Sequence, residues 1–245
     1  MSKNATNDER RPKGALNDMG VDSGPSSPPG ARGKTTKSKA KSTVERAGSA
    51  RGQITIEKLV QAAGEVLEET GFEKLTSNAI CARAGLTPPA FYHYFADKYQ
   101  MLEHLADRLL EKQSVAFGDW VKAHALGRRE APSVESVEAL FAQLIEIASG
   151  EPGAIWTIRA LRALPNLSHV RLRWLRRYTD EIFAVVRPSV PESSWPLLWS
   201  RIRIVVEFGY VVDEIVYEED KISRETIIRE AAWMIQSNLQ RIYEY

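Results

Sequence analysis

The sequence predicts an all-α protein in which an N-terminal three-helix unit with a helix-turn-helix precedes a larger helical body. Apolar residues recur at helical spacing through most of residues 53–245, and no alternating strand pattern is present. Residues 76–98 carry the signals of two short helices about a tight turn, because Thr76 and Thr87 are capping residues and Gly85 ends the first helix.

Residues 1–52 form a segment of different composition. They are rich in Gly, Pro, Ser, Lys and Thr and hold almost no apolar residue, so we expect a disordered arm. The arm has 11 Lys and Arg against 5 Asp and Glu, whereas the rest of the chain has 22 against 27. Such an arm fits attraction to a polyanion, and it also fits a tail that only keeps the protein soluble.

The first predicted helix runs from Thr55 to about Thr70, where Gly71 stops it. In the third predicted helix Phe91 and Phe95 are four residues apart, so they share the packed face. The opposite surface then carries Pro89, Ala90, His93 and Tyr94, with Tyr92 at the border. A partly buried structural role is the alternative for His93.

The body is predicted to consist of six further helices separated by Pro, Gly and polar breaks. The first of them begins after the capping residue Asp97 and links the N-terminal unit to everything downstream. The others are expected at about 134–149, 154–164, 168–187, 194–218 and 223–243.

The last two predicted helices carry more apolar surface than one face needs. We therefore expect a second copy of the chain to cover part of it, and a central core helix beside an ordinary amphipathic one is the alternative. The residues predicted at the dimer interface are Trp199, Val206, Tyr210, Ile227, Ala231, Ile235 and Leu239.

Residues 53–102 resemble the DNA-binding domain of the TetR family of bacterial transcriptional regulators. The matching motifs are T-I-E-K-L-V-Q-A-A from Thr55, T-G-F from Thr70, T-S-N-A-I-C-A-R-A-G-L-T from Thr76, and F-Y-H-Y-F-A-D-K from Phe91. The resemblance implies a DNA-binding domain at 53–100 and a helical ligand-binding and dimerisation domain at 101–245. Downstream of residue 102 it is a resemblance of architecture only.

The resemblance also implies that the third helix enters the major groove of double-stranded operator DNA. The implied DNA-binding residues are Thr76, Ser77, Thr87, Pro88, Pro89, Tyr92, His93, Tyr94 and Lys98, to which Arg51 of the arm is added. Many relatives have Lys or Gly where this chain has Pro88 and Pro89. Proline donates no hydrogen bond, but it can contact a thymine methyl.

Residues 53–100 hold 4 Lys and Arg against 6 Asp and Glu, an unusual balance for a DNA reader. The electrostatic affinity for DNA must then come from where these charged residues are placed, or from residues outside 53–100. We expect the basic arm to supply phosphate or minor-groove contacts, as arms do in other helix-turn-helix proteins.

The aromatic residues of the body lie in helices that enclose a small-molecule pocket in this family. The predicted ligand-binding residues are Trp120, Phe141, Trp156, Arg159, Tyr178 and Phe208. For any single aromatic residue an ordinary core position is the alternative, and for Arg159 a solvated helix face. The expected effector is small and largely apolar.

The sequence contains no pattern of catalysis, metal binding or membrane insertion. Four scattered histidines lack ligand spacing, and no nucleophile or phosphate-loop motif occurs, so we expect no enzyme activity, no metal and no cofactor. The longest apolar region, 202–217, contains four charged residues, among them Asp213, which argues against a membrane span. The N-terminus has no apolar signal segment, and Cys81 is the single cysteine, so no disulfide can form within the chain. We therefore expect a cytoplasmic protein.

These observations predict a homodimeric, sequence-specific transcriptional regulator, in particular a repressor released from its operator by a small effector. One alternative is a regulator without an effector, whose body serves dimerisation or protein docking. The more remote one is a helical enzyme with an appended DNA reader.

Overall fold

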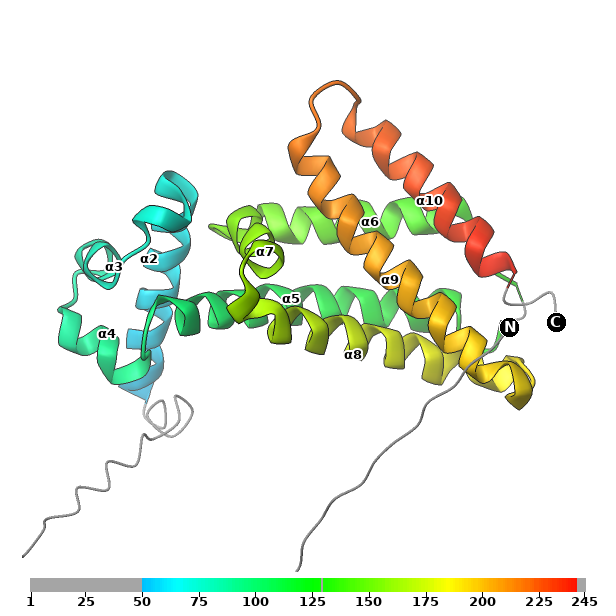
Figure 1. Cartoon of the computed structure of the whole chain (residues 1–245), viewed down its shortest axis with the longest axis horizontal. Coiled ribbons are helices and arrows are strands. Elements are labelled where there is room, and N and C mark those ends of the chain that lie inside the picture. Colours follow the sequence, from blue (N-terminus) through cyan, green and yellow to red (C-terminus); the bar gives the residue numbers. More distant parts are fainter. Residues whose placement is uncertain (1–49, 129, 242–245) are drawn as a thin grey trace, which may run out of the picture. The chain divides into compact units, whose positions relative to one another are not determined.

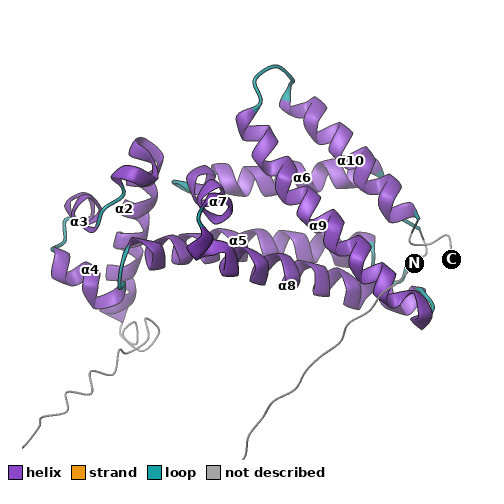
Figure 2. Cartoon of the chain, in the orientation of Figure 1, coloured by secondary structure: helices purple, strands orange, loops and turns teal. Residues whose placement is uncertain are grey.

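The computed structural model of the chain describes residues 50–128 and 130–241. Within these ranges all regular secondary structure is helical, which confirms the predicted all-α class (Figure 2). The predicted arm lies outside the described residues except for its last three, 50–52, which begin the first described helix.

The N-terminal unit consists of α2 (Ala50–Lys74), α3 (Ser77–Ala84) and α4 (Pro88–Tyr94) (Figure 1). The start of α2 differs from the predicted start at Thr55. The Thr55 hydroxyl donates to the Arg51 carbonyl at 2.9 Å, so it makes a bond of the helix interior and does not cap. Gly71 interrupts the helix as predicted, with a φ of 74° that favours glycine.

The body comprises α5 to α10, with 3₁₀ turns between α7 and α8 and between α8 and α9. Three of its helices begin after side-chain caps that the sequence supplies, since Asp97, Ser133 and Ser223 each accept hydrogen bonds from the first turn. The helices are α5 (Lys98–His124), α6 (Val134–Ser149), α7 (Ala154–Ala163), α8 (Ser168–Val186), α9 (Trp195–Glu218) and α10 (Arg224–Gln240). These bounds confirm the predicted helices to within a few residues.

A single hydrophobic cluster joins the N-terminal unit to the body. Phe91 of α4 and Phe95, which directly follows that helix, are buried in it, which confirms their packed face, and Met101 and Leu102 of α5 are buried beside them. Residues of α7 and α8, among them Leu161, complete the cluster. The three helices of the N-terminal unit therefore share their core with the body.

The long helix α5 connects the two regions directly. It leaves the N-terminal unit and runs into the body beside α8 (Figure 1). Its first turns belong to the cluster around Phe91, and its later turns contribute Phe117, Trp120 and Val121 to clusters of the body. One continuous helix thus packs into both regions.

Candidate functional site

The helix pair α3 and α4 forms the predicted helix-turn-helix. Thr76 caps α3 by accepting a hydrogen bond from the Ala79 amide at 3.1 Å. Gly85 ends the helix in the left-handed conformation, with a φ of 66°, and the Leu86 amide then donates to the Cys81 carbonyl at 2.9 Å. This closed turn sets the angle at which α4 leaves α3.

Two prolines open α4. Pro88 and Pro89 occupy its first turn, where backbone amides have no partner within the helix, so proline costs no hydrogen bond there. Thr87 precedes them in an extended conformation, and its side chain makes no capping bond. All three side chains are exposed, so the start of α4 offers hydroxyl and apolar groups.

The outer face of α4 carries the predicted reading residues. Tyr92 is 55% exposed and His93 is exposed, whereas Tyr94 is half-buried with its ring edge-on to the His93 ring at 4.7 Å. The Tyr92 hydroxyl lies 2.9 Å from the Ser77 hydroxyl of α3. This hydrogen bond joins two predicted DNA contacts across the turn.

The cations of this unit are few, and two of them are engaged. Arg83 forms ion pairs with Glu65 at 3.2 Å and with Glu69 at 2.5 Å, which lowers the pKa of Glu69 and raises that of the guanidinium. The Lys98 ammonium lies 4.0 Å from the centre of the Phe72 ring. Arg51 is exposed in the first turn of α2, next to the residues that the structure leaves undescribed.

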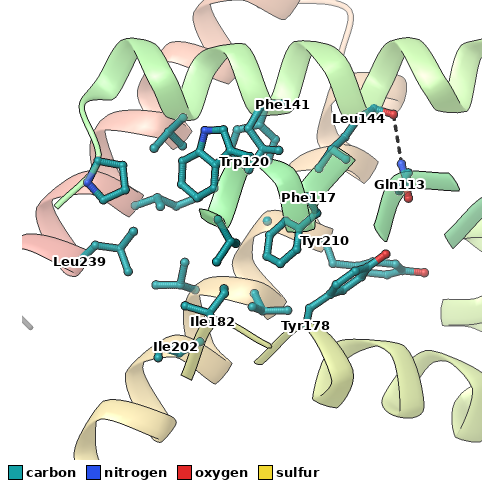
Figure 3. Close-up of a pocket in the computed structure, with 18 of the residues that line it drawn as sticks. Gln113, Phe117, Trp120, Phe141, Leu144, Tyr178, Ile182, Ile202, Tyr210 and Leu239 are labelled. Carbon is teal, nitrogen blue, oxygen red and sulfur yellow. Dashed lines mark hydrogen bonds between the residues drawn. The ribbon is translucent and has the colours of Figure 1, made fainter. Parts of the chain in front are cut away.

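A second candidate site is a cavity in the body, enclosed mainly by α5, α6, α8, α9 and α10. Its volume is about 130 Å³, and its walls are almost entirely aliphatic and aromatic (Figure 3). Of the predicted ligand-binding residues, Trp120, Phe141 and Tyr178 line it. A pocket of this composition suits a small apolar molecule.

The other three predicted ligand-binding residues lie outside the cavity. Trp156 of α7 packs against the backbone of Gly71, and the Arg159 guanidinium lies 5.4 Å above the Trp156 ring while pairing with Glu218 at 3.4 Å. Phe208 packs into the cluster between α6, α9 and α10. Helical spacing turns these side chains away from the space between α5 and α9.

Two polar residues of the cavity wall, Gln113 and Asp213, are not among the predicted ligand-binding residues. Asp213 lies in a run of apolar residues in α9, and its Oδ1 is buried without a hydrogen-bond partner among the described residues. Burial raises the pKa of Asp213 to about 7, against the lowering effect of Arg224. The carboxylate of Asp213 within the apolar run V-V-D-E-I-V is the sequence signal that points to this position.

The residues predicted at a dimer interface face inward for the most part. Tyr210, Ala231 and Ile235 are buried in the chain's own core, and Val206 and Leu239 line the cavity. Trp199 and Ile227 are half-buried; the Trp199 indole donates to Asp180 at 2.9 Å. The large apolar side chains that α9 and α10 leave exposed are Leu197, Ile204, Ile215, Trp233 and Met234.

Residues 50–128 and 130–241 contain no cluster of three His, Cys, Asp or Glu side chains arranged to hold a metal ion. None of the described helices combines the length and apolar character needed to cross a bilayer.

Comparisons with known proteins agree with this geometry. Residues 59–105 match the sequence pattern of the bacterial regulatory proteins of the tetR family. The chain is similar to the tetracycline repressor protein class C of Escherichia coli, with 24% identity over 131 residues, or 43% of this chain and 60% of that protein. The alignment thus spans less than two thirds of that repressor.

Solved structures share the fold. A TetR-family transcriptional regulator from Streptomyces coelicolor matches with a TM-score of 0.52 and 19% identity, over 77% of this chain and 99% of that one. SmeT, the repressor of the Stenotrophomonas maltophilia multidrug efflux pump SmeDEF, matches with a TM-score of 0.55 and 18% identity, over 74% and 88%. Residues 59–105, from α2 to α5, thus carry the sequence pattern of the DNA-binding domain of the tetR family of bacterial regulatory proteins, and the described chain shares the fold of solved TetR-family regulators.

Proposed function

We propose that the protein is a repressor that binds operator DNA as a homodimer and is released from it by a small, largely apolar effector. The observation that carries the proposal is the apolar cavity of about 130 Å³, whose wall includes α5, the helix that also packs into the DNA-reading unit. A regulator whose body served only dimerisation would have no use for such a space.

DNA recognition is assigned to α4 and to the N-terminus of α3. Tyr92 and His93 are exposed on α4 and are placed to meet bases or phosphates, and Thr76 and Ser77 bring hydroxyls to the start of α3. In a dimer with a twofold axis, two such helices read half-sites about 34–36 Å apart. With Arg83 held by two glutamates, phosphate attraction is assigned to Arg51 and the arm before it.

The dimer interface is assigned to the exposed apolar faces of α9 and α10. Ile204 is 64% exposed on α9, and Trp233 is 60% exposed on α10. Large apolar side chains at such exposure are what a second copy of the chain would cover.

Release follows from linkage between the two sites. An effector that fills the cavity pushes on Phe117 and Trp120 of α5, and a shift of α5 moves Met101 and Leu102 against the core of the reader. If the occupied form holds its two reading helices at the wrong spacing, effector and DNA each weaken the binding of the other.

The test is a DNA-binding titration with fluorescein-labelled DNA from upstream of the protein's own gene. We expect protection of an inverted repeat, and loss of binding when a suitable single-ring compound is added. Val205→Phe fills the cavity, so it should keep DNA binding and lose the response, whereas Val115→Phe, at an exposed position of α5, should keep both. An equal response in the two variants would refute release through the cavity.

A further inference from the structure

Most of the hydrogen-bond donors on the polar side chains that line the cavity are already engaged. The Trp120 indole donates to the Ser136 carbonyl at 2.8 Å, and the Gln113 amide donates to the Leu144 carbonyl at 3.1 Å (Figure 3). The hydroxyls of the neighbouring rings Tyr178 and Tyr210 donate to backbone carbonyls at 2.9 and 3.0 Å. The three ring donors are therefore engaged, and so is one of the two N–H groups of the Gln113 amide.

One acceptor in the wall remains unsatisfied. Asp213 lines the cavity, and its Oδ1 is inaccessible to solvent and accepts no hydrogen bond from the residues described. A buried polar atom without a partner is uncommon in a folded protein and is costly to keep. An N–H or O–H group on a ligand would satisfy it.

The charged groups of the cavity wall also restrict which ligands can bind. No Lys, Arg or His is found among the described residues that line the cavity, so an anionic ligand would meet the Asp213 carboxyl without a countercharge. A cation would instead neutralise the carboxylate and contact the faces of aromatic rings such as Phe117 and Trp120. The wall thus favours positive charge over negative.

We propose that the effector is a small organic monocation, an amine whose N–H donates to the Asp213 carboxylate while its hydrocarbon part fills the aromatic and aliphatic wall. The inference rests on the proposed function, because it names the effector class for the same cavity. The volume of about 130 Å³ limits the ligand to about one ring, since an apolar cavity of about 150 Å³ is known to bind benzene.

The groups around Asp213 set the pH at which this pairing operates. Burial raises the pKa of Asp213 to about 7, and it also raises the pKa of Tyr178, Tyr210 and Tyr217, which stay neutral near pH 7. Arg224 is the charged group that acts on the carboxyl from α10. The side chains that α6 and α5 bring to this region, among them Phe141, Ile145 and Gln113, do not titrate. Amine affinity should therefore rise from pH 6 to pH 8 as Asp213 ionises.

The test is calorimetric titration of the full-length protein with three probes of one size: benzylamine, benzyl alcohol and benzoate. We expect benzylamine to bind most tightly and benzoate most weakly at pH 8. Asp213→Asn should weaken benzylamine at least tenfold and remove its pH dependence, while changing benzyl alcohol less than threefold. The control Glu214→Gln alters the next residue of α9, whose side chain pairs with Arg162 at 2.6 Å, and should bind like wild type.

Several outcomes would overturn the amine assignment: benzoate or benzyl alcohol binding as tightly as benzylamine, equal benzylamine affinity in wild type and Asp213→Asn, or no binding of benzylamine.

DNA titration with the same compounds separates the two proposals. Benzylamine that binds through Asp213 without releasing DNA would refute effector release and leave the amine site standing. Release of DNA by benzyl alcohol, with no release by benzylamine, would support effector release and refute the amine assignment.

Discussion

Gly64 of α2 and Gly153, just before α7, meet backbone to backbone. A Cβ atom on Gly64 would lie 2.5 Å from the Pro152 carbonyl oxygen, and one on Gly153 would lie 2.6 Å from the Gly64 carbonyl oxygen. The Gly153 amide also donates to Glu68 of α2 at 3.3 Å. The first helix of the DNA reader thus rests directly on the turn between α6 and α7.

Ion pairs hold the same junction. Arg108 of α5 pairs with Glu57 of α2 at 2.5 Å and with Glu151 of the α6–α7 turn at 3.1 Å. Lys112, one turn further along α5, also pairs with Glu151. Reader, linking helix and body therefore meet at one place.

Gly64→Ala is expected to destabilise the protein by about 1–3 kcal/mol, because the added methyl group would overlap the Pro152 carbonyl and force α2 and the turn apart. Urea denaturation measures the change. The control is Gly118→Ala in α5, where an added Cβ would meet no atom within 4 Å. There alanine should stabilise by about 0.5–1 kcal/mol through its helix propensity. Equal effects of the two substitutions would contradict the close approach.

Asp213→Asn should change how stability depends on pH. The folded-state pKa of Asp213 is raised to about 7 from the ordinary 3.8, so the folded protein keeps this proton after the unfolded chain has lost it. Stability should therefore fall as pH rises from about 4 to about 7. The Asn variant has no carboxyl and no such loss. Its free energy of unfolding should therefore exceed that of wild type by about 1–3 kcal/mol at pH 8, with near equality at pH 4.5.

Urea denaturation at the two pH values tests the sign. Asp220→Asn, at an exposed position after α9, serves as the control and should follow the wild-type profile. If the stability of wild type instead rose relative to that of Asp213→Asn with increasing pH, the pKa of this carboxyl would be shifted in the opposite direction.

Deleting residues 1–50 should weaken operator binding and flatten its salt dependence. Residues 34–50 contribute 5 Lys and Arg against 1 Asp or Glu, and each phosphate contact adds about 0.9 to the slope of log affinity against log salt. We expect the slope to fall by up to about 4 in an anisotropy titration. Deleting only residues 1–33, with 5 Lys and Arg against 4 Asp and Glu, should leave most of the slope. Unchanged affinity and slope in the longer deletion would show that the arm does not touch DNA.

Ile204→Glu should weaken the dimer. The side chain is 64% exposed on α9, and a charge buried there against a second copy would lack a partner. We expect a shift towards monomer at micromolar concentration in size-exclusion chromatography with light scattering. Val115→Glu is matched in exposure at 63% on α5 and should leave the mass unchanged. If both variants remained dimers, the interface would lie away from this face.

The positions of the helices and the nature of the DNA reader follow from local signals in the sequence. Caps such as Thr76 and Asp97, the left-handed Gly85 and the spacing of Phe91 and Phe95 act within a few residues of the chain. Local signals of this kind predict secondary structure without any knowledge of the tertiary packing. The start of α2 was missed because Thr55 can either cap a helix or bond four residues back, and its own sequence does not decide between them.

Which side chains face the cavity depends instead on how the helices pack against one another. Trp120, Phe141 and Trp156 look alike in sequence, yet the first two line the cavity and the third covers Gly71. Tyr210 and Ile204 both suit a dimer face by composition, and packing buries the one and exposes the other. A helix has several faces, and which of them turns inward depends on neighbours distant in the chain. The same holds for Oδ1 of Asp213, because only the full set of its described neighbours shows that it accepts no hydrogen bond from them.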